Sequence, residues 1–135
     1  MFKSKFIFIV ISFLLVLTSC STVDPMQALG YTWRAYERTI RWDDISGAVH
    51  FLKEDAVSTS KFPKEVKNLK VTGYDVIRKS INDDDMIATQ EVKIRFYNVN
   101  DFIEKSFIDK QEWKFDEKNN RWYLSSKLLK FPIEK

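Results

Sequence analysis

The order of apolar and polar positions divides the chain into a leader, a helical part and a run of strands. Residues 6–17 (FIFIVISFLLVL) are apolar apart from Ser12 and follow two lysines within residues 1–5. A charged stretch followed by an apolar stretch is the layout of a secretory signal. A helix over residues 6–17 rises about 18 Å, short of the roughly 30 Å that a membrane span must cross. We therefore predict a signal peptide rather than a retained transmembrane helix.

Residues 24–53 have the spacing of amphipathic helices. Asp24 precedes Pro25 and Gln27, a combination that signals a helix start. A first helix over about 25–41 is predicted by one apolar stripe, made of Met26, Leu29, Trp33, Tyr36 and Ile40. Asp43 or Asp44 can cap a second helix ending near residue 53, with an apolar face of Ile45, Ala48, Val49 and Leu52.

From about residue 68 the apolar positions alternate, which predicts strands. The preceding residues 54–67 are polar and predict a loop, with room for a short helix that starts at Pro63. Four strands are predicted, over residues 68–80, 85–98, 103–115 and 121–131. Gly73 marks a candidate bulge. Ile103 and Leu128 are expected on the apolar faces of the third and fourth strands. The short polar turns between strands predict an antiparallel meander.

Two helices followed by four half-polar strands predict an α+β domain over residues 25–135, with the helices on one face of a curved four-stranded antiparallel sheet. This order resembles the nuclear transport factor 2-like (SnoaL-like) superfamily of cone-shaped domains. The resemblance covers most of residues 25–131. It rests on the aromatic-bearing first helix, the short helix opened by Asp43-Asp44 and the hairpin around Trp113 and Trp122. A cystatin-like α+β sheet is the alternative.

The sequence Leu17-Thr18-Ser19-Cys20 resembles the bacterial lipobox, in which an aliphatic residue and two small residues precede a cysteine. The resemblance implies that the thiol of Cys20 receives diacylglycerol, that the signal is cut before it, and that the new amine is acylated, for example with palmitate. We predict residues 1–19 as signal peptide and 20–24 as lipidated anchor and spacer. The alternative is an ordinary secretory signal that leaves Cys20 as an unpaired thiol.

Charge narrows the choice of partners. Of 22 basic residues, Lys3 and Lys5 leave with the signal, so 20 basic residues remain against 19 acidic ones. A near-neutral domain gives no electrostatic argument for nucleic acid, and none is predicted as a partner. Two basic groups remain, Arg34, Arg38 and Arg41 in the first helix and Lys61, Lys64, Lys67 and Lys70 before the first strand. We interpret both as solvated faces; the alternative is contact with anionic headgroups or an acidic partner.

The third predicted strand contains an anomaly, because Asp109 and Gln111 share the phase of its buried aromatic residues. A carboxylate and an amide therefore point toward the helices, which is costly unless they are paired or hydrated. The superfamily resemblance implies a pocket between the first helix and the sheet. Its candidate lining residues are Trp33, Tyr36, Gln90, Asp109, Gln111 and Trp113. Alternatively, Asp109 lies at a wetted end, pairs with Lys105, or is turned outward by a bulge.

The sequence contains no nucleophile motif, glycine-rich phosphate loop or metal-ligand spacing, so we assign no catalytic residue, metal or cofactor. The single histidine, His50, is expected to face solvent. We predict a membrane-anchored envelope lipoprotein that acts as a non-catalytic binding or assembly module, with membrane lipid, an envelope protein or a small apolar ligand as partners. The alternatives are an isomerase, dehydratase or hydrolase that uses Asp109, and a subunit of an envelope or secretion complex. Ser21 favours outer-membrane attachment facing the periplasm in a diderm source.

Overall fold

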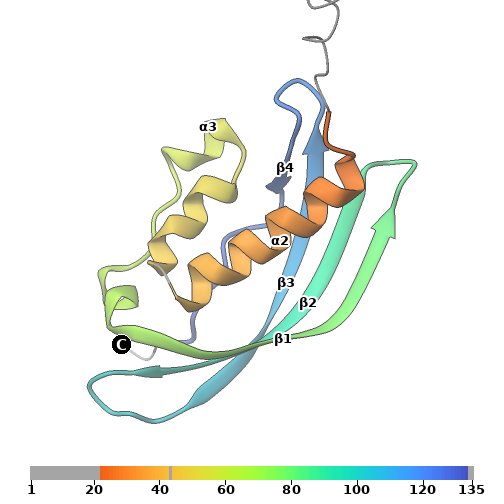
Figure 1. Cartoon of the computed structure of the whole chain (residues 1–135). Coiled ribbons are helices and arrows are strands. Elements are labelled where there is room, and N and C mark those ends of the chain that lie inside the picture. Colours follow the sequence, from red (N-terminus) through yellow and green to blue (C-terminus); the bar gives the residue numbers. More distant parts are fainter. Residues whose placement is uncertain (1–21, 43, 134–135) are drawn as a thin grey trace, which may run out of the picture.

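The sheet organises the domain. The computed structural model describes residues 22–42 and 44–133 of the chain. Helices lie on one face of an open, four-stranded antiparallel sheet with the order β1-β2-β3-β4 (Figure 1). The strands are β1 (Leu69–Asn82), β2 (Ile87–Asn98), β3 (Lys105–Asp116) and β4 (Arg121–Leu124). The predicted α+β class and antiparallel meander are therefore confirmed.

The first described helix, α2 (Pro25–Arg41), has the predicted bounds. The Asp24 carboxylate accepts a hydrogen bond of 3.2 Å from the backbone N–H of Gln27, which satisfies one of the free donors at the helix start. The indole Nε1 of Trp122 donates a 2.7 Å hydrogen bond to the carbonyl oxygen of Pro25. This hydrogen bond attaches the first turn of α2 to β4, although Pro25 and Trp122 lie far apart in the sequence.

The second helical segment differs from the prediction. It is a 3₁₀ helix, η2 (Ile45–Phe51), which ends before residue 53 and is capped by the Asp44 carboxylate. Asp43 lies outside the described residues. The segment contains a glycine and β-branched residues, which disfavour an α-helix, and 3₁₀ hydrogen bonding is common in such short pieces. The predicted loop contains a single turn, α3 (Glu54–Val57), and a second 3₁₀ helix, η3 (Lys64–Asn68), which Pro63 precedes as expected.

Strand β1 is irregular at two places. Its register against β2 shifts between Val71 and Gly73, which confirms the predicted bulge, and again between Val76 and Arg78, which was not predicted. A Cβ at Gly73 would meet the guanidinium of Arg95, which is the end of a flexible side chain and would have to move. Bulges bend a strand and increase its twist, and β1 is visibly bent in Figure 1.

The ends of β3 and β4 correct two predictions. Ile103 precedes β3 and is 59% exposed, so its expected inward position is wrong. The adjacent Phe102 has a left-handed backbone with a φ of 55°, which interrupts the alternation just before the strand. Strand β4 ends at Leu124 rather than near residue 131, because the N–H groups of Ser125 and Ser126 both turn to the carbonyl of Glu112.

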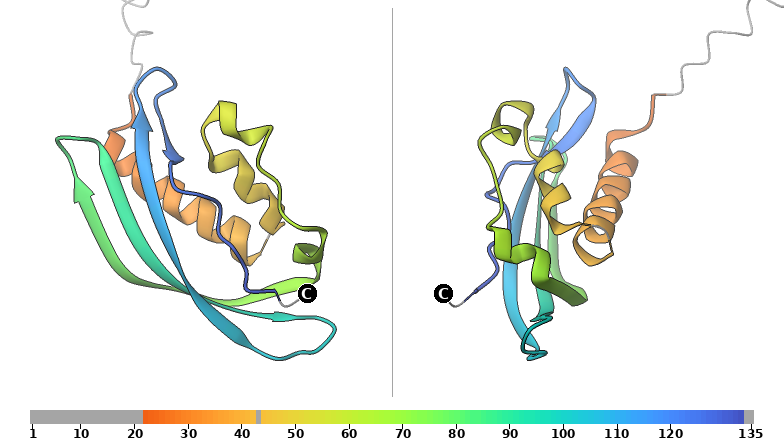
Figure 2. Two further views of the ribbon diagram at one scale, coloured as in Figure 1. Left: turned by 180° about the vertical axis from the view of Figure 1, so that it is seen from behind. Right: turned by 90° about the vertical axis from the view of Figure 1, so that its left-hand side faces the viewer.

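Residues 125–133 continue as an extended segment without strand pairing, and Figure 2 shows this segment running past the helical segments. Its Leu129 and Phe131 are buried, whereas Leu128 is only partly buried. The ring of Phe131 packs against Phe96 at 5.1 Å and against Phe107 at 5.2 Å, measured between ring centroids. Aromatic packing therefore holds the segment where strand pairing was expected.

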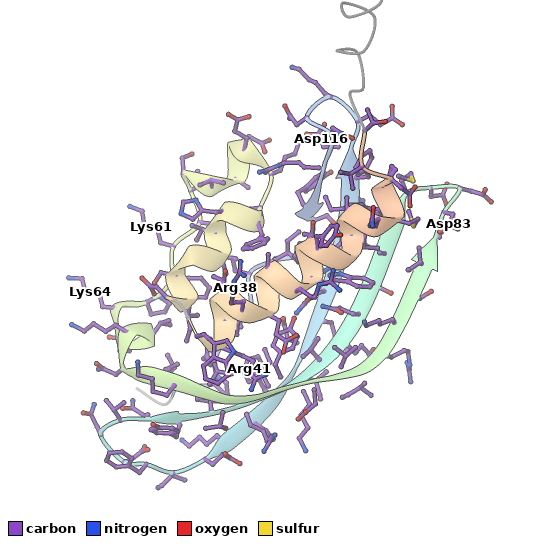
Figure 3. All side chains as sticks on the ribbon, in the orientation of Figure 1. Arg38, Arg41, Lys61, Lys64, Asp83 and Asp116 are labelled. Atoms are coloured by element: carbon purple, nitrogen blue, oxygen red, sulfur yellow. The ribbon has the colours of Figure 1, made fainter. Side chains whose placement is uncertain are left out.

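Acidic turns lie at the end of the domain where α2 begins. The backbone N–H of Phe115 donates to the carbonyl of Met86 at 3.2 Å, which holds the β1–β2 and β3–β4 turns near each other. Asp83 and Asp116 mark these turns in Figure 3, and Lys61 and Lys64 project from the other side of the domain. The described domain thus has acidic residues in the turns next to its N-terminal helix start, accompanied there by Lys53 and Lys118, and it bears Lys61 and Lys64 on the side away from this end.

Candidate functional site

The buried polar residues of β2 and β3 form one cluster. The described part of the chain buries three side chains of this kind, Gln90 (2% exposed), Asp109 (7%) and Gln111 (3%). The β2–β3 register places Gln90 directly opposite Gln111 and continues without a shift through Asp109. The predicted inward phase is therefore confirmed, and the alternative that a bulge turns the pair outward is wrong.

One amide connects the whole cluster. The Oε1 atom of Gln111 accepts hydrogen bonds from Gln90 Nε2 at 2.7 Å and from Trp113 Nε1 at 3.2 Å. Its Nε2 atom donates to Asp109 Oδ2 at 2.7 Å and to the Tyr74 hydroxyl at 3.0 Å. We call these five residues the Gln111 cluster. Because they come from three strands, the cluster exists only when the sheet has formed.

Burial controls the protonation of the cluster. It raises the pKa of the Asp109 carboxyl, and the hydrogen bond from Gln111 partly offsets this effect. Burial also raises the pKa of the Tyr36 hydroxyl, with a further contribution from Asp109, and that of the Tyr74 hydroxyl. No ion pair involves Asp109 among residues 22–42 and 44–133. The amide of Gln111 is the hydrogen-bond partner of the Asp109 carboxyl.

The cluster is next to polar atoms that lack a partner. Within the described chain, Trp33 Nε1, Tyr36 OH and Gln90 Oε1 are buried and form no hydrogen bond. The Tyr36 ring packs edge to face on Trp113, with 5.2 Å between centroids. Trp33 lies farther toward β1, where Lys79 Nζ is 4.8 Å from the centre of its ring. The structure thus brings Tyr36, Gln90, Asp109 and Trp113 together around Gln111, while the sixth candidate, Trp33, lies apart. The role of these residues as a ligand pocket stays a prediction.

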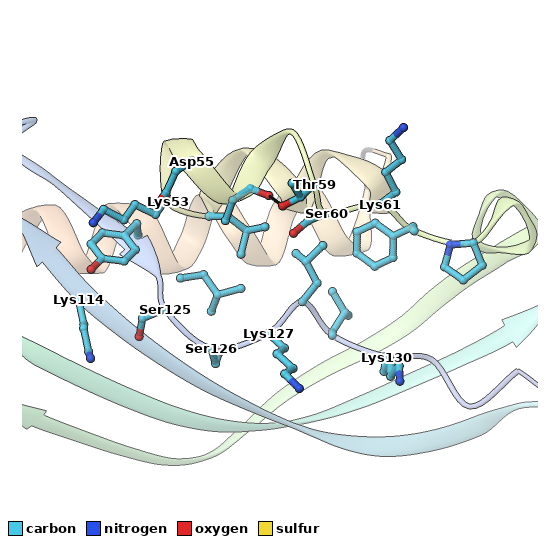
Figure 4. Close-up of a pocket in the computed structure, with 18 residues that line it drawn as sticks. Lys53, Asp55, Thr59, Ser60, Lys61, Lys114, Ser125, Ser126, Lys127 and Lys130 are labelled. Carbon is cyan, nitrogen blue, oxygen red and sulfur yellow. Dashed lines mark hydrogen bonds between the residues drawn. The ribbon is translucent and has the colours of Figure 1, made fainter.

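A second site escaped the sequence prediction. An open groove of about 760 Å³ lies between the segment that contains α3 and the C-terminal segment (Figure 4). We call it the lysine groove, because its lining includes five lysines and one acidic residue, namely Lys53, Lys61, Lys114, Lys127, Lys130 and Asp55. None of the six predicted pocket residues lines it. The polar run Ser125-Ser126-Lys127, within the predicted fourth strand, is the part of the sequence that could have indicated this groove.

The lysines of the groove differ in their partners. Lys114 Nζ lies 3.4 Å from a carboxylate oxygen of Glu112. In the part of the chain that is described, no carboxylate pairs with Lys61, Lys127 or Lys130. Figure 4 shows Lys127 extending from the C-terminal segment and Lys61 from the opposite wall, both directed away from the space between the two walls. The unneutralised positive charge therefore lies along the two outer edges of the groove.

The remaining sequence predictions concern the single histidine, the two basic groups and the lipid attachment residue. His50 is exposed, as expected, and so are Lys64, Lys67 and Lys70. Arg41 pairs with Glu37 at 3.1 Å. The predicted lipid attachment residue, Cys20, lies outside the described residues.

The described residues lack two further kinds of site. No helix among them has the length and apolar character needed to cross a membrane. They contain no group of three or more histidine, cysteine, aspartate or glutamate side chains arranged to hold a metal.

Comparison with known proteins finds no match among family models, curated proteins or solved structures. The fold and its sites define the class to which the chain can be assigned. It is an α+β domain with an open antiparallel sheet, a buried polar cluster between helix and sheet, and a lysine-lined groove on its surface.

Proposed function

We propose that the chain is a lipid-anchored protein of the bacterial cell envelope whose domain acts as a non-catalytic binding or assembly module. The observation that carries this proposal is the sequence Leu17-Thr18-Ser19-Cys20, which follows a charged and then apolar leader and directly precedes the domain. One acyl chain binds a membrane reversibly, whereas two or three, at about 0.8 kcal/mol per buried CH₂, anchor a protein stably. In a diderm source, Ser21 favours the outer membrane, with the domain in the periplasm.

A spacer as short as residues 21–23 would hold the domain close to its membrane. Residues 21–23 separate the anchor from the Asp24 cap, and three extended residues reach about 10 Å. The hydrogen bond from Trp122 to Pro25 makes the helix start a fixed part of the domain. In this arrangement the acidic turns near Asp116 face the bilayer side, and the lysine-bearing side faces away. Charge therefore favours a protein partner over anionic headgroups as the target of the basic residues.

Anchoring can be tested in cells that express the full chain. We expect wild type to incorporate labelled palmitate and to enter the detergent phase on phase separation. Cys20→Ser should lose the label, and its N-terminal peptide should lack the mass of the lipid. Ser19→Ala is the matched control, because it keeps a small residue before the cysteine and should be acylated normally. Wild type without label, or with an unmodified Cys20 by mass spectrometry, would contradict the proposal.

A second candidate function is a small-ligand pocket at the Gln111 cluster, either in a binding protein or in an enzyme that uses Asp109. It is supported by the three buried polar atoms without a partner and by the raised pKa of Asp109, which suits a general acid. Similarity of element order to the cone-shaped nuclear transport factor 2-like superfamily also supports it. Native mass spectrometry of the full chain is the test, and a bound small molecule released by Gln90→Leu is the expected result.

A further inference from the structure

We propose that the lysine groove binds an extended segment of a partner protein in which acidic residues alternate with apolar ones. This inference rests on the proposed role of the domain as a binding module and specifies the chemistry of its partner. Three properties of the groove support it: its charge, the unpaired backbone of its walls, and its mixture of apolar and polar lining.

The charge of the groove requires an anionic occupant. Five lysines and one aspartate line it, in a chain whose formal net charge is only +3. Lys61, Lys127 and Lys130 have no ion pair within the described chain, so their ammonium groups are available to carboxylates. Partly exposed pairs of this kind contribute specificity and association rate more than affinity.

The backbone of the walls favours a polypeptide over other anions. Leu52 and Leu124 form an isolated parallel bridge at the groove, and beyond it the two chain segments separate. Lys127, Leu128 and Lys130 on one wall and residues 61–62 on the other make no hydrogen bond through their backbone groups to any described residue, whereas Leu129 is buried. An extended peptide can pair with such groups, as it does when it adds a strand to an open edge. An anionic lipid would use the lysines but leave these donors and acceptors unpaired.

The mixed apolar and polar lining favours a bound segment in which acidic and apolar residues alternate. Apolar side chains such as Ala56, Phe62 and Leu128 line the groove together with its lysines and hydroxyl groups. Successive side chains of an extended peptide point to opposite sides. Acidic residues at every second position would meet the lysines at the edges of the groove, while the residues between them would contact the apolar lining. The volume of about 760 Å³ lies within the range of roughly 300–1,000 Å³ that is typical of binding sites.

The test measures binding of a fluorescent octapeptide with alternating leucine and glutamate to the full chain in detergent micelles. We expect saturable binding that weakens at least tenfold in Lys127→Glu/Lys130→Glu. Lys64→Glu/Lys67→Glu is the matched control, because these lysines are also exposed and three positions apart but do not line the groove. It should change affinity less than twofold. Circular dichroism of both variants should match that of wild type.

Three outcomes would overturn the proposal. The first is equal binding by the groove variant and wild type. The second is equally tight binding of octaglutamate, which would show that the apolar positions contribute nothing. The third is loss of binding to phosphatidylglycerol vesicles in the groove variant with no peptide binding by wild type, which would assign the groove to lipid. Repeating the peptide titration with Cys20→Ser separates the two proposals, because the groove should bind equally well whether or not the anchor exists.

Discussion

Replacing Gln111 with leucine tests whether one amide holds the buried polar cluster together. Leucine has a similar size, so the substitution removes hydrogen bonds without opening a large cavity. The Asp109 carboxylate and the Trp113 indole lose their partner, while Gln90 keeps a longer contact of 3.3 Å to the Tyr74 hydroxyl. Each buried group left unsatisfied costs about 1–3 kcal/mol, and more if charged. We therefore expect the free energy of unfolding at pH 7 to fall by about 4 kcal/mol, the sum for one neutral and one charged group.

The loss should depend on pH in a defined direction. Burial raises the pKa of Asp109 above its ordinary value, and the Gln111 hydrogen bond lowers it, so the substitution raises it further. A carboxyl whose pKa is higher in the folded than in the unfolded state stabilises the fold below the unfolded pKa. This contribution is lost as the pH rises through the folded pKa. The stability difference between wild type and Gln111→Leu should thus be smaller at pH 4 than at pH 7.

Urea unfolding at both pH values, followed by tryptophan fluorescence, measures this difference. The control is the same substitution made in an Asp109→Asn chain, where the pH dependence should disappear because the titrating group is absent. A loss below 1 kcal/mol at pH 7, or a loss that is equal at both pH values, would refute the reasoning. The first result would mean that the cluster is hydrated, and the second that Asp109 does not respond to Gln111.

Three further changes test single contacts. Tyr36→Phe removes a buried hydroxyl that has no partner among the described residues, so thermal unfolding should show that the free energy of unfolding rises by up to about 1 kcal/mol. A lower free energy of unfolding would indicate that the hydroxyl binds a ligand or water. Trp122→Phe removes the hydrogen bond to Pro25, and urea unfolding should show that the free energy of unfolding falls by about 1 kcal/mol. An unchanged urea midpoint would contradict this prediction. Asp24→Ala should cost about 1 kcal/mol by the same assay, and Asp24→Asn, which can still cap the helix, should cost much less.

The predictions that succeeded depend on local repetition in the sequence. The stripe that includes Leu29, Tyr36 and Ile40 predicted α2, and the alternation around Gln90 predicted the inner face of β2, since periodicity determines which side chains share a face. The failures lie where long-range contacts decide the backbone. Residues 125–131 have the alternation of a strand, but bonds to Glu112 and packing of Phe131 on Phe107 hold them out of the sheet.

The sequence by itself determined the class of the fold, the order of its strands, the inward phase of Asp109 and Gln111, and the lipobox-like sequence around Cys20. These follow from neighbouring residues, which the sequence shows directly. Only the tertiary structure decided that the single amide of Gln111 connects to four other residues and that lysines from separate segments line one groove. Lys61 and Lys127 are far apart along the chain, and their common groove depends on how the helical and C-terminal segments pack against the sheet. Periodicity carries no information about that packing.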